Sequence, residues 1–274
     1  DAATRLARHF NDPRVGAVAG YVKVGNRRGL LTALQSIEYV TAQNVDRRAA
    51  ELIGAMLVVP GAIGAWRAEA VRAAGGLSGD TITEDADLTV AIQRAGWRVV
   101  FEPSAQSLTE VPEGARAFLR QRLRWTFGMM QTAWKHRGAL REGRAVGRIA
   151  LPDLWLFGLG LGMLAPLADL VLFGVILHLG IDWALGAPPA AMGGAATMVA
   201  AWLALPALET LTLILALRFR RDEPYWLLLL LPFQRLVYRP LLYITIWRAV
   251  LLALIGRLAG WGKLIRTGRV RAPA

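Results

Sequence analysis

The uneven distribution of apolar residues constrains the fold of this 274-residue chain more than any single motif does. Residues 1–148 mix charged and apolar side chains, whereas residues 149–256 consist mainly of Leu, Ala, Val, Ile and Trp. The whole chain is 55% hydrophobic and still carries a formal net charge of +12, a combination that is unusual for one soluble domain. The sequence therefore predicts a globular half joined to a membrane half.

Two stretches of the second half are long enough to cross a bilayer. Residues 154–180 and 196–217 both reach the roughly 20 residues that a transmembrane helix needs. The loop between them, residues 181–195, contains no Lys or Arg, whereas RFRRDE (218–223) after the second stretch contains three Arg. The positive-inside rule therefore places the first loop outside the cell and the second in the cytosol, together with the globular half.

A third apolar stretch, residues 225–256, is interrupted by Arg235 and Arg239, which lie between Pro232 and Pro240. A charged residue at the centre of a bilayer costs roughly 2.5–3.5 kcal/mol on insertion scales. The tail that follows is again basic, so both flanks belong inside and the number of crossings should be even. We therefore expect a broken or re-entrant hairpin, with a single span lining a polar cavity as the alternative. The basic residues of the tail are Arg257, Lys263, Arg266, Arg269 and Arg271.

Strand-like and helix-like segments alternate in the first half of the chain. Buried strands are indicated at residues 15–24 and 97–103, and a strand that breaks at Pro60-Gly61 is indicated within residues 56–67. Apolar periodicity or terminal glycines indicate helices at residues 3–10, 30–52, 67–76 and 83–96. Because strands and helices alternate, the sequence predicts an α/β fold for this half.

Residues 115–137 interleave basic and aromatic side chains in a helical pattern. A basic helix with aromatic residues on its apolar side is typical of the membrane interface, and an ordinary helix on the domain surface is the alternative. The basic residues are Arg116, Arg120, Arg122, Arg124 and Lys135.

Residue counts exclude several functional classes. The chain has no Cys, which excludes disulfides and Cys-based metal sites within it, and its three His have no paired spacing that would predict zinc. Its positive charge could suit nucleic acid, anionic lipid headgroups or a phosphate-bearing substrate. Because the basic residues flank apolar segments and no DNA- or RNA-binding motif is present, we expect membrane lipid and no nucleic acid as a partner.

Three carboxylates, those of Glu84, Asp85 and Asp87, precede a helical pattern in TITEDADLTVAI (81–92). Thr81 and Glu84 match the S/T-x-x-E capping box, and acidic residues in a first turn suit the helix dipole. Residues two apart on a helix diverge, so a metal shared by Asp85 and Asp87 is not expected. A carboxylate here could instead act as a general base. The acids alone leave the structural and the catalytic interpretation open.

A second candidate element is QRLRW (121–125). The planar fork of Arg fits phosphate oxygens, Trp offers a flat face to a sugar ring, and Gln can hydrogen-bond hydroxyl or phosphate groups. Taken alone, Arg122 and Arg124 would more often be solvated charges or lipid contacts.

TED (83–85) followed by QRLRW and then by membrane spans resembles the processive family 2 glycosyltransferases, which include cellulose, chitin, hyaluronan and poly-β-1,6-N-acetylglucosamine synthases. Within this group the bacterial poly-N-acetylglucosamine type, sometimes fused to a polysaccharide deacetylase, is the most similar. The other segments that carry the resemblance are GYVKVGNR (20–27), VVPGAIGAWR (58–67), FQRLVYR (233–239) and GWGKLIRTG (260–268).

The resemblance implies a domain organisation. Residues 1–114 would be the C-terminal, acceptor-side part of a GT-A catalytic domain, and residues 115–148 would be amphipathic interface helices. Residues 149–256 would form an α-helical transmembrane bundle, and residues 257–274 a basic cytosolic tail. The protein would lie in the bacterial inner membrane as a multi-pass protein, with its catalytic part in the cytosol.

The resemblance also implies roles for individual residues. Asp85 would be the general base that deprotonates the acceptor hydroxyl as it attacks the anomeric carbon, in an inverting displacement, and Glu84 would orient or tune it. Gln121, Arg122 and Arg124 would steady the leaving pyrophosphate, where negative charge develops. Trp125 would stack on the acceptor sugar, and Pro60 and Gly61 would shape the acceptor pocket, although a plain turn at the end of a strand explains those two nearly as well.

The expected reaction is transfer of sugar from a UDP-sugar, with UDP-N-acetylglucosamine first, to a growing β-linked polysaccharide that is then exported. The enzyme alternatives are a UDP-glucose or hyaluronan-type synthase and a non-processive transferase with a lipid acceptor. A transporter or scaffold without chemistry is the alternative from another class. A fused or associated deacetylase or an export subunit would be a further partner. Neither a cyclic-di-GMP module nor an F-x-V-T-x-K gating loop is found, which counts against cellulose.

The chain starts at Asp1 without a Met or a signal peptide, and we expect it to be the C-terminal part of a longer protein. In the family, the donor half upstream contains a D-x-D that binds Mg or Mn. The resemblance therefore implies a divalent metal in the whole protein and no metal ligands in these residues.

Overall fold

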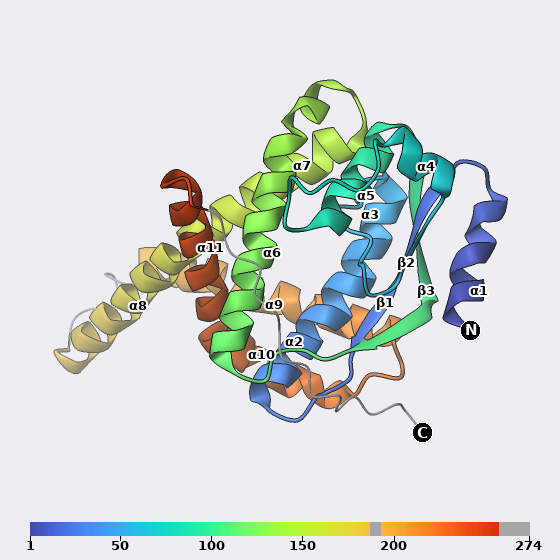
Figure 1. The fold of residues 1–274 in the computed structure, drawn as a ribbon. Helices are drawn as coiled ribbons and strands as arrows, with labels where there is room; N and C mark the ends of the chain where they lie inside the picture. The colour runs from blue at the N-terminus through green and yellow to red at the C-terminus, as the bar shows by residue number, and fades with distance from the viewer. Residues whose placement is uncertain (187–192, 258–274) are drawn as a thin grey trace.

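The computed structural model describes residues 1–186 and 193–257. A three-stranded sheet lies at the centre of the globular half (Figure 1). Strand β1 (Val15–Val24) pairs antiparallel with β2 (Gly64–Trp66) on one side and parallel with β3 (Arg98–Thr109) on the other. Its apolar run up to Val22 is buried because core clusters lie on both of its faces. The predicted α/β class is confirmed.

Six helices belong to this half, and the predicted ones form close to their expected positions. Helix α5 ends at Arg94, and Gly96 follows with a φ of 98°, a conformation that favours glycine. A wide π-helical turn, Thr41–Asp46, separates α2 from α3 inside the predicted helix 30–52. The helices are α1 (Ala2–Ala7), α2 (Leu30–Val40), α3 (Arg47–Ile53), α4 (Ala68–Ala73), α5 (Glu84–Arg94) and α6 (Ala115–Lys135).

The predicted strand within residues 56–67 is only partly correct, because regular pairing is confined to the three residues of β2. Side chains of α5 occupy the backbone groups that precede it. The Val59 N–H donates to Thr89 Oγ1 at 2.9 Å, and the Met56 carbonyl accepts a hydrogen bond from the Gln93 side-chain amide at 2.5 Å. The segment before Pro60 is therefore fixed by a helix and not by a neighbouring strand.

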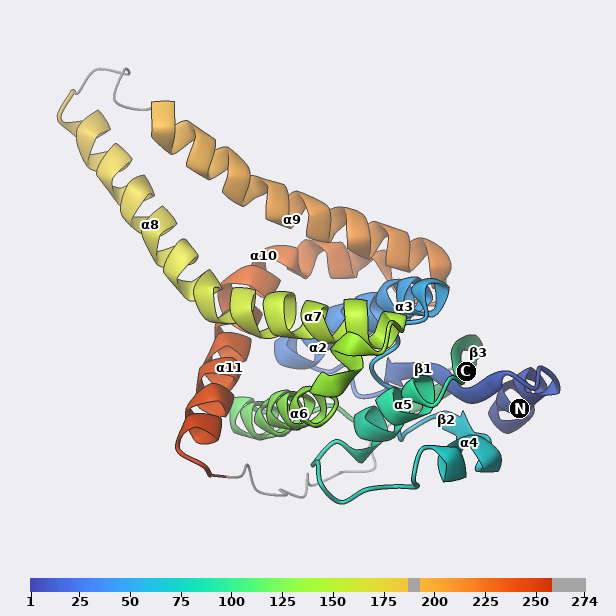
Figure 2. The same ribbon diagram turned by 90° about the horizontal axis from the view of Figure 1, so that it is seen from above.

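Three helical segments of the described chain are long and apolar enough to cross a membrane, namely Val146–Ala184, Thr197–Phe219 and Tyr225–Leu254. The first two contain α8 (Gly162–Ala184) and most of α9 (Gly193–Phe219), and they form a hairpin that projects from the rest of the molecule (Figure 2). The two predicted spans therefore correspond to candidate membrane helices. A short helix, α7 (Leu151–Asp153), and the π-helical turn Leu154–Leu161 lead into α8.

The turn after α9, which contains RFRRDE, lies against the globular half, and its predicted cytosolic position stays a prediction. Lys23 forms ion pairs with Asp222 at 2.7 Å and with Glu223 at 3.2 Å. The Arg220 guanidinium lies 4.2 Å from the centre of the Tyr21 ring and donates to the Pro103 carbonyl. The far end of the hairpin points away from this contact (Figure 2).

The third segment is broken, as its prolines and arginines predict. It passes through α10 (Leu231–Phe233) and the π-helical turn Gln234–Tyr238, and it changes direction before α11 (Arg239–Leu254) (Figure 2). Whether the number of crossings is even stays a prediction. The basic tail and GWGKLIRTG lie outside the described residues, apart from Arg257.

The two central arginines of this segment are paired with acids of the other two segments. Arg235 donates to Asp169 of α8 at 3.0 Å and lies 4.2 Å from the centre of the Trp202 ring. Arg239 forms an ion pair with Glu209 of α9. These pairs offset part of the cost of placing charge among apolar helices.

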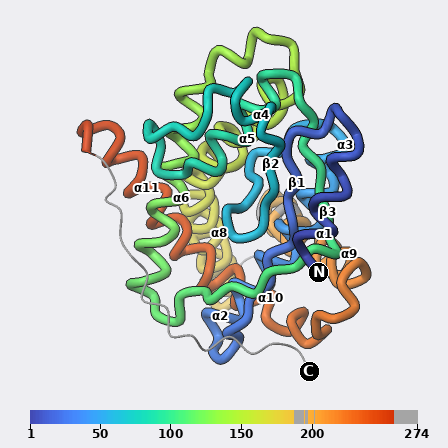
Figure 3. Tube along the Cα trace, turned by 45° about the vertical axis from the view of Figure 1, so that its right-hand side comes forward, coloured from blue at the N-terminus to red at the C-terminus, as the bar shows by residue number. Residues whose placement is uncertain are grey.

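One hydrophobic cluster joins the two halves. It combines apolar side chains of α2 with Phe118 of α6, with Leu213 and Leu217 of α9, and with Leu227 and Tyr238 of the third segment. In Figure 3 the tube of α2 runs beside that of α10. Helix α6 also packs on α5 and α11, and its position at a membrane interface stays a prediction.

Candidate active site

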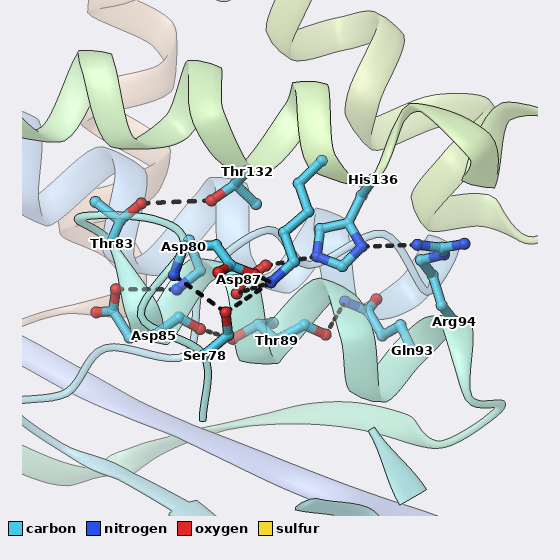
Figure 4. Close-up of polar contacts among 12 residues, drawn as sticks. Ser78, Asp80, Thr83, Asp85, Asp87, Thr89, Gln93, Arg94, Thr132 and His136 are labelled. Atoms are coloured by element: carbon cyan, nitrogen blue, oxygen red, sulfur yellow. Dashed lines mark hydrogen bonds and ion pairs between the residues drawn. The ribbon is translucent and has the colours of Figure 1, made fainter. Parts of the chain in front are cut away.

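The TED segment forms the start of α5, but it is not fixed by the predicted capping box. The helix begins at Glu84, so the flanking residue is Thr83 and not Thr81. Within the described chain, the hydroxyl of Thr81 is buried without a hydrogen-bond partner. That of Thr83 lies 3.4 Å from Thr132 Oγ1 on α6 (Figure 4). The prediction was wrong because contacts with α6, rather than a local S/T-x-x-E pair, hold this helix start.

Asp85 lies at the turn that follows Pro60. Its Oδ2 accepts a hydrogen bond from the Gly61 N–H at 3.2 Å, and its Oδ1 accepts one from the Ala86 N–H at 2.9 Å. The side chain is half-buried beside the exposed glycine. Burial raises the pKa of Asp85, the two backbone hydrogen bonds act against this, and the nearby charge of Glu84 adds to it. The structure thus brings together two of the predicted site elements, Asp85 and the Pro60-Gly61 turn.

Asp87 belongs to a different set of contacts from Asp85. Its carboxylate accepts hydrogen bonds from His136 Nε2 at 2.7 Å and from Lys135 Nζ at 2.8 Å. Because Arg94 donates to Nδ1 of His136, the other ring nitrogen carries the proton. Burial alone would raise the pKa of Asp87, but the hydrogen bonds from His136 and Lys135 bring it below its ordinary value. Asp85 and Asp87 therefore do not face a common metal position.

A glycine allows the helix with TED to approach the helix with QRLRW. A Cβ atom at Gly128 of α6 would lie 2.5 Å from Thr83 Cγ2 and 2.6 Å from Thr83 Oγ1. Such distances are far below van der Waals contact, so a larger residue at this crossing would force the Thr83 side chain or one of the helices to shift. The Ile82 N–H also donates to Gln131 Oε1 of α6 at 3.1 Å. The two motifs that the sequence singles out are therefore parts of one packed unit.

The residues of QRLRW occupy different surroundings on α6. Gln121 and Arg122 are buried, whereas Arg124 and Trp125 are half-buried. Trp125 packs against a core cluster that includes Ile63, two residues beyond Gly61. Arg122 donates to Glu38 and to the Tyr238 hydroxyl, and its guanidinium lies 4.6 Å from the centre of the Trp125 ring.

The model of glycosyl transferase family group 2 matches residues 1–259. The chain belongs to this family. Its similarity to two curated relatives is consistent with that assignment. It is 32% identical to the poly-β-1,6-N-acetyl-D-glucosamine synthase of Staphylococcus aureus strain COL over 129 residues, and this alignment covers 47% of this chain and 31% of that protein. It is 32% identical to an N-acetylglucosaminyltransferase of Bradyrhizobium diazoefficiens over 214 residues, and this alignment covers 73% of this chain and 43% of that protein.

The fold is similar to that of a solved glycosyltransferase structure. A mannosyltransferase from Pyrobaculum calidifontis, in complex with GDP-mannose and Mn²⁺, superposes with a TM-score of 0.55 at 18% sequence identity. The match covers 94% of this chain and 59% of that one. The expected GT-A-like fold with apolar C-terminal helices is therefore confirmed. The chain spans less than half the length of the two curated relatives.

The described residues contain no group of three or more His, Cys, Asp or Glu side chains that could hold a metal ion. The two acids nearest to a D-x-D pattern, Asp85 and Asp87, have separate partners. A divalent metal of a family 2 enzyme therefore does not fit these residues.

Sequence reasoning missed a buried cation near the site of this family member. Arg47, at the start of α3, is 8% exposed and donates to the Gly20 carbonyl at 2.6 Å. Burial lowers the pKa of Arg47 to about 10, against the opposing effect of the nearby Asp85 charge. An arginine inside the apolar pattern of residues 30–52 was the available signal. Glu38, Tyr238 and Gly128 were missed as well, because their partners are distant in sequence.

Proposed function

We propose that the full-length protein is a membrane-bound inverting glycosyltransferase. It transfers sugar from a UDP-sugar, with UDP-N-acetylglucosamine as the first candidate, to a growing β-linked polysaccharide and takes part in its export. The observation that carries the proposal is Asp85, a half-buried carboxylate of raised pKa at an exposed glycine turn, on a helix packed against the QRLRW helix. The names of the two curated relatives support the choice of sugar.

In this proposal Asp85 is the general base. Its carboxylate accepts the proton of an acceptor hydroxyl while that oxygen forms a bond to the anomeric carbon and the bond from this carbon to the UDP oxygen breaks. A pKa above the ordinary value makes Asp85 a stronger base than an exposed aspartate. The neighbouring charge of Glu84 contributes to this shift.

The other site residues bind the substrates. Gln121 and Arg124 stabilise the negative charge that develops on the leaving UDP. Trp125, held against the cluster that contains Ile63, stacks on the acceptor sugar, and the Pro60-Gly61 turn forms a wall of the acceptor pocket. A divalent metal, Mg or Mn, would be held by the rest of the protein. The Mn²⁺ in the mannosyltransferase structure supports this expectation.

We also propose that the globular half faces the cytosol of a bacterium, with the protein in its inner membrane. The turn that contains Asp222 and Glu223 contacts the globular half, and the end of α8 and the start of α9 lie away from it, as a pair of crossings requires. A deacetylase or an export subunit would act on the polymer after its synthesis.

The test is sugar transfer by membranes that contain the full-length protein, incubated with labelled UDP-N-acetylglucosamine, followed by sizing of the product. We expect a polymer, and we expect Asp85→Asn to reduce its synthesis by about 10²-fold to 10⁴-fold, the usual contribution of a general base. Asp80→Asn, the same change at an exposed side chain of the preceding loop, serves as the control and should leave synthesis unchanged.

Three results would contradict the proposal. Single-sugar lipid products would replace the polymerase by a non-processive transferase. Incorporation from UDP-glucose but not from UDP-N-acetylglucosamine would change the donor. Unchanged function of Asp85→Asn would favour a transporter or scaffold without chemistry.

A further inference from the structure

Arg122, the second residue of QRLRW, is enclosed in the protein interior. Its side chain is 7% exposed, with one guanidinium nitrogen donating to Glu38 and another to the Tyr238 hydroxyl at 3.0 Å. The Tyr238 hydroxyl in turn donates to the second oxygen of Glu38. The three side chains form a closed triangle that joins α2, α6 and the π-helical turn of the third membrane segment.

The surroundings of Arg122 leave little room for a phosphate group. The Phe118 and Trp125 rings lie 5.1 Å and 4.6 Å from the guanidinium carbon, and the Tyr238 ring contacts Phe118. The Nε atom of Arg122 is buried and has no partner among the described residues. A phosphate would have to displace the Glu38 carboxylate, which already neutralises this cation. Arg124, by contrast, is half-buried on another side of α6.

We infer that Arg122 is a positioning residue and not a phosphate ligand. Together with Glu38 and Tyr238, it fixes the QRLRW helix to the third membrane segment, so that Trp125 and Arg124 are presented correctly to the substrates. This assigns Arg122 a role different from the one its motif implies. The inference rests on the proposed glycosyl transfer, because the role of a positioning residue is defined by that reaction.

Tyr238 is well placed for this function because its neighbours in the same segment are anchored to the other spans. Arg235 pairs with Asp169 and Arg239 pairs with Glu209, one on each side of Tyr238 in the sequence. A shift of the third segment relative to the hairpin would therefore reach α6 through the Tyr238 hydroxyl. A buried, hydrogen-bonded ion pair suits such a role because it specifies one geometry.

Steady-state kinetics of the full-length protein separate the two roles of arginine in QRLRW. We expect Arg122→Lys and Tyr238→Phe to lower kcat by about ten-fold, the factor that corresponds to one hydrogen bond to a charged group. The KM for the UDP-sugar and the inhibition by UDP should stay unchanged. Arg124→Lys should instead raise that KM and weaken inhibition by UDP. Tyr225→Phe, the same change at an exposed tyrosine of the same segment, is the control.

A double-substituted protein tests whether the residues act as a unit. If they do, Glu38→Gln combined with Tyr238→Phe lowers kcat no further than the more severe single change. Independent contributions, with the two factors multiplying, would contradict the inference. So would an Arg122→Lys protein whose KM for the UDP-sugar and inhibition by UDP change as in Arg124→Lys.

A second readout does not depend on activity. Spin labels at positions 120 and 248, both exposed, report the separation of α6 and α11 in the full-length protein. Residues 1–274 contain no cysteine, and any cysteine elsewhere in the protein is replaced before labelling. We expect Tyr238→Phe to broaden or shift the distance distribution, and Tyr225→Phe to leave it unchanged. An unchanged distribution together with an unchanged kcat would overturn the inference. Activity retained by Asp85→Asn would overturn the proposed function instead, so the two failures are distinguishable.

Discussion

Asp85 and Asp87 lie two positions apart in the first turn of α5, yet their pKa values are shifted in opposite directions. Burial raises the pKa of Asp85, whose carboxylate accepts backbone N–H groups. Asp87 is buried as well, but hydrogen bonds from His136 and Lys135 lower its pKa. One helix start thus combines a carboxylate suited to accept a proton with another that is kept ionised and ties α5 to the end of α6.

The opposite shifts predict opposite effects on stability. The folded state binds a proton on Asp85 more tightly than the unfolded chain does, so stability falls as pH rises from the ordinary pKa of 3.8 through the raised value. Asp85→Asn removes this cost, and we expect the variant to unfold at an equal or higher temperature at neutral pH than the unsubstituted protein.

We expect Asp87→Asn, in contrast, to lower the unfolding temperature at neutral pH. The stability that Asp87 contributes is present above the ordinary pKa and is lost as pH falls through the lowered one. Loss of its two charge-assisted hydrogen bonds should cost about 1.5–3 kcal/mol at neutral pH. Thermal unfolding of the purified full-length variants in detergent measures both effects. A lower melting temperature for both variants would contradict the interpretation of Asp85.

The hydrogen bond from the Gly61 N–H to Asp85 predicts that the pH dependence of sugar transfer shifts when this donor is removed. Transfer requires ionised Asp85, so its rate falls as pH decreases through the pKa of this group. The hydrogen bond from Gly61 lowers that pKa. Gly61→Pro removes the donor, and we expect the acid limb of the pH–rate profile to move to higher pH.

Gly61→Ala is the matched control for this experiment. It keeps the N–H, and its Cβ atom would lie 3.9 Å from Asp85 Oδ2, an ordinary contact. Its acid limb should coincide with that of the unsubstituted protein. Identical profiles for Gly61→Pro and Gly61→Ala would show that the hydrogen bond does not act on the base.

Local sequence patterns predicted the elements of this fold better than the contacts between them. The apolar run of β1 and the period of residues 30–52 are local, and both elements form as expected. The capping box at Thr81 was wrong because Thr132 and Gln131, about 50 residues away, hold the start of α5. A pairing such as Glu38 with Tyr238 spans 200 residues, and no local pattern encodes it.

The candidate site shows the same difference between local patterns, which the sequence predicts, and contacts between distant residues, which it does not. TED and QRLRW were found from the sequence because each is a short run of residues. What the sequence does not encode is that Arg122 and Arg124, two positions apart on α6, occupy different surroundings. A helix turns by about 200° over two residues, so one of them can enter the interior while the other stays near the surface. Which of them enters depends on α2 and on the third membrane segment.

The contact between Gly128 and Thr83 predicts a substitution and its rescue. Gly128→Ala places a methyl group 2.5 Å from Thr83 Cγ2, which forces α6 away from the TED helix. Overpacking of this kind typically costs about 1–3 kcal/mol. We expect a lower melting temperature and slower sugar transfer by the full-length variant.

Thr83→Ala should restore much of the stability of Gly128→Ala, because it removes the two atoms that clash. The remaining Thr83 Cβ would lie 3.0 Å from the new methyl carbon, close enough for a small adjustment. Two destabilisations that simply add would show that the helices do not meet at this point.

The ion pair between Arg235 and Asp169 predicts that removing only one of the two charges destabilises the membrane segments. Arg235 is 9% exposed, and Asp169 also accepts a hydrogen bond from Trp202 Nε1 at 3.1 Å. Arg235→Gln leaves the carboxylate without its main cation among apolar helices, and we expect a loss of about 1–3 kcal/mol. Asp169→Asn combined with Arg235→Gln should be more stable than Arg235→Gln alone, because no unpaired charge remains and Trp202 can still donate to the amide oxygen.

Arg248→Gln, at an exposed position of α11, is the control and should leave the melting temperature unchanged. The test is the melting temperature of each detergent-solubilised variant. If the double variant is less stable than Arg235→Gln, the two charges do not compensate each other, and apolar packing alone holds the third segment.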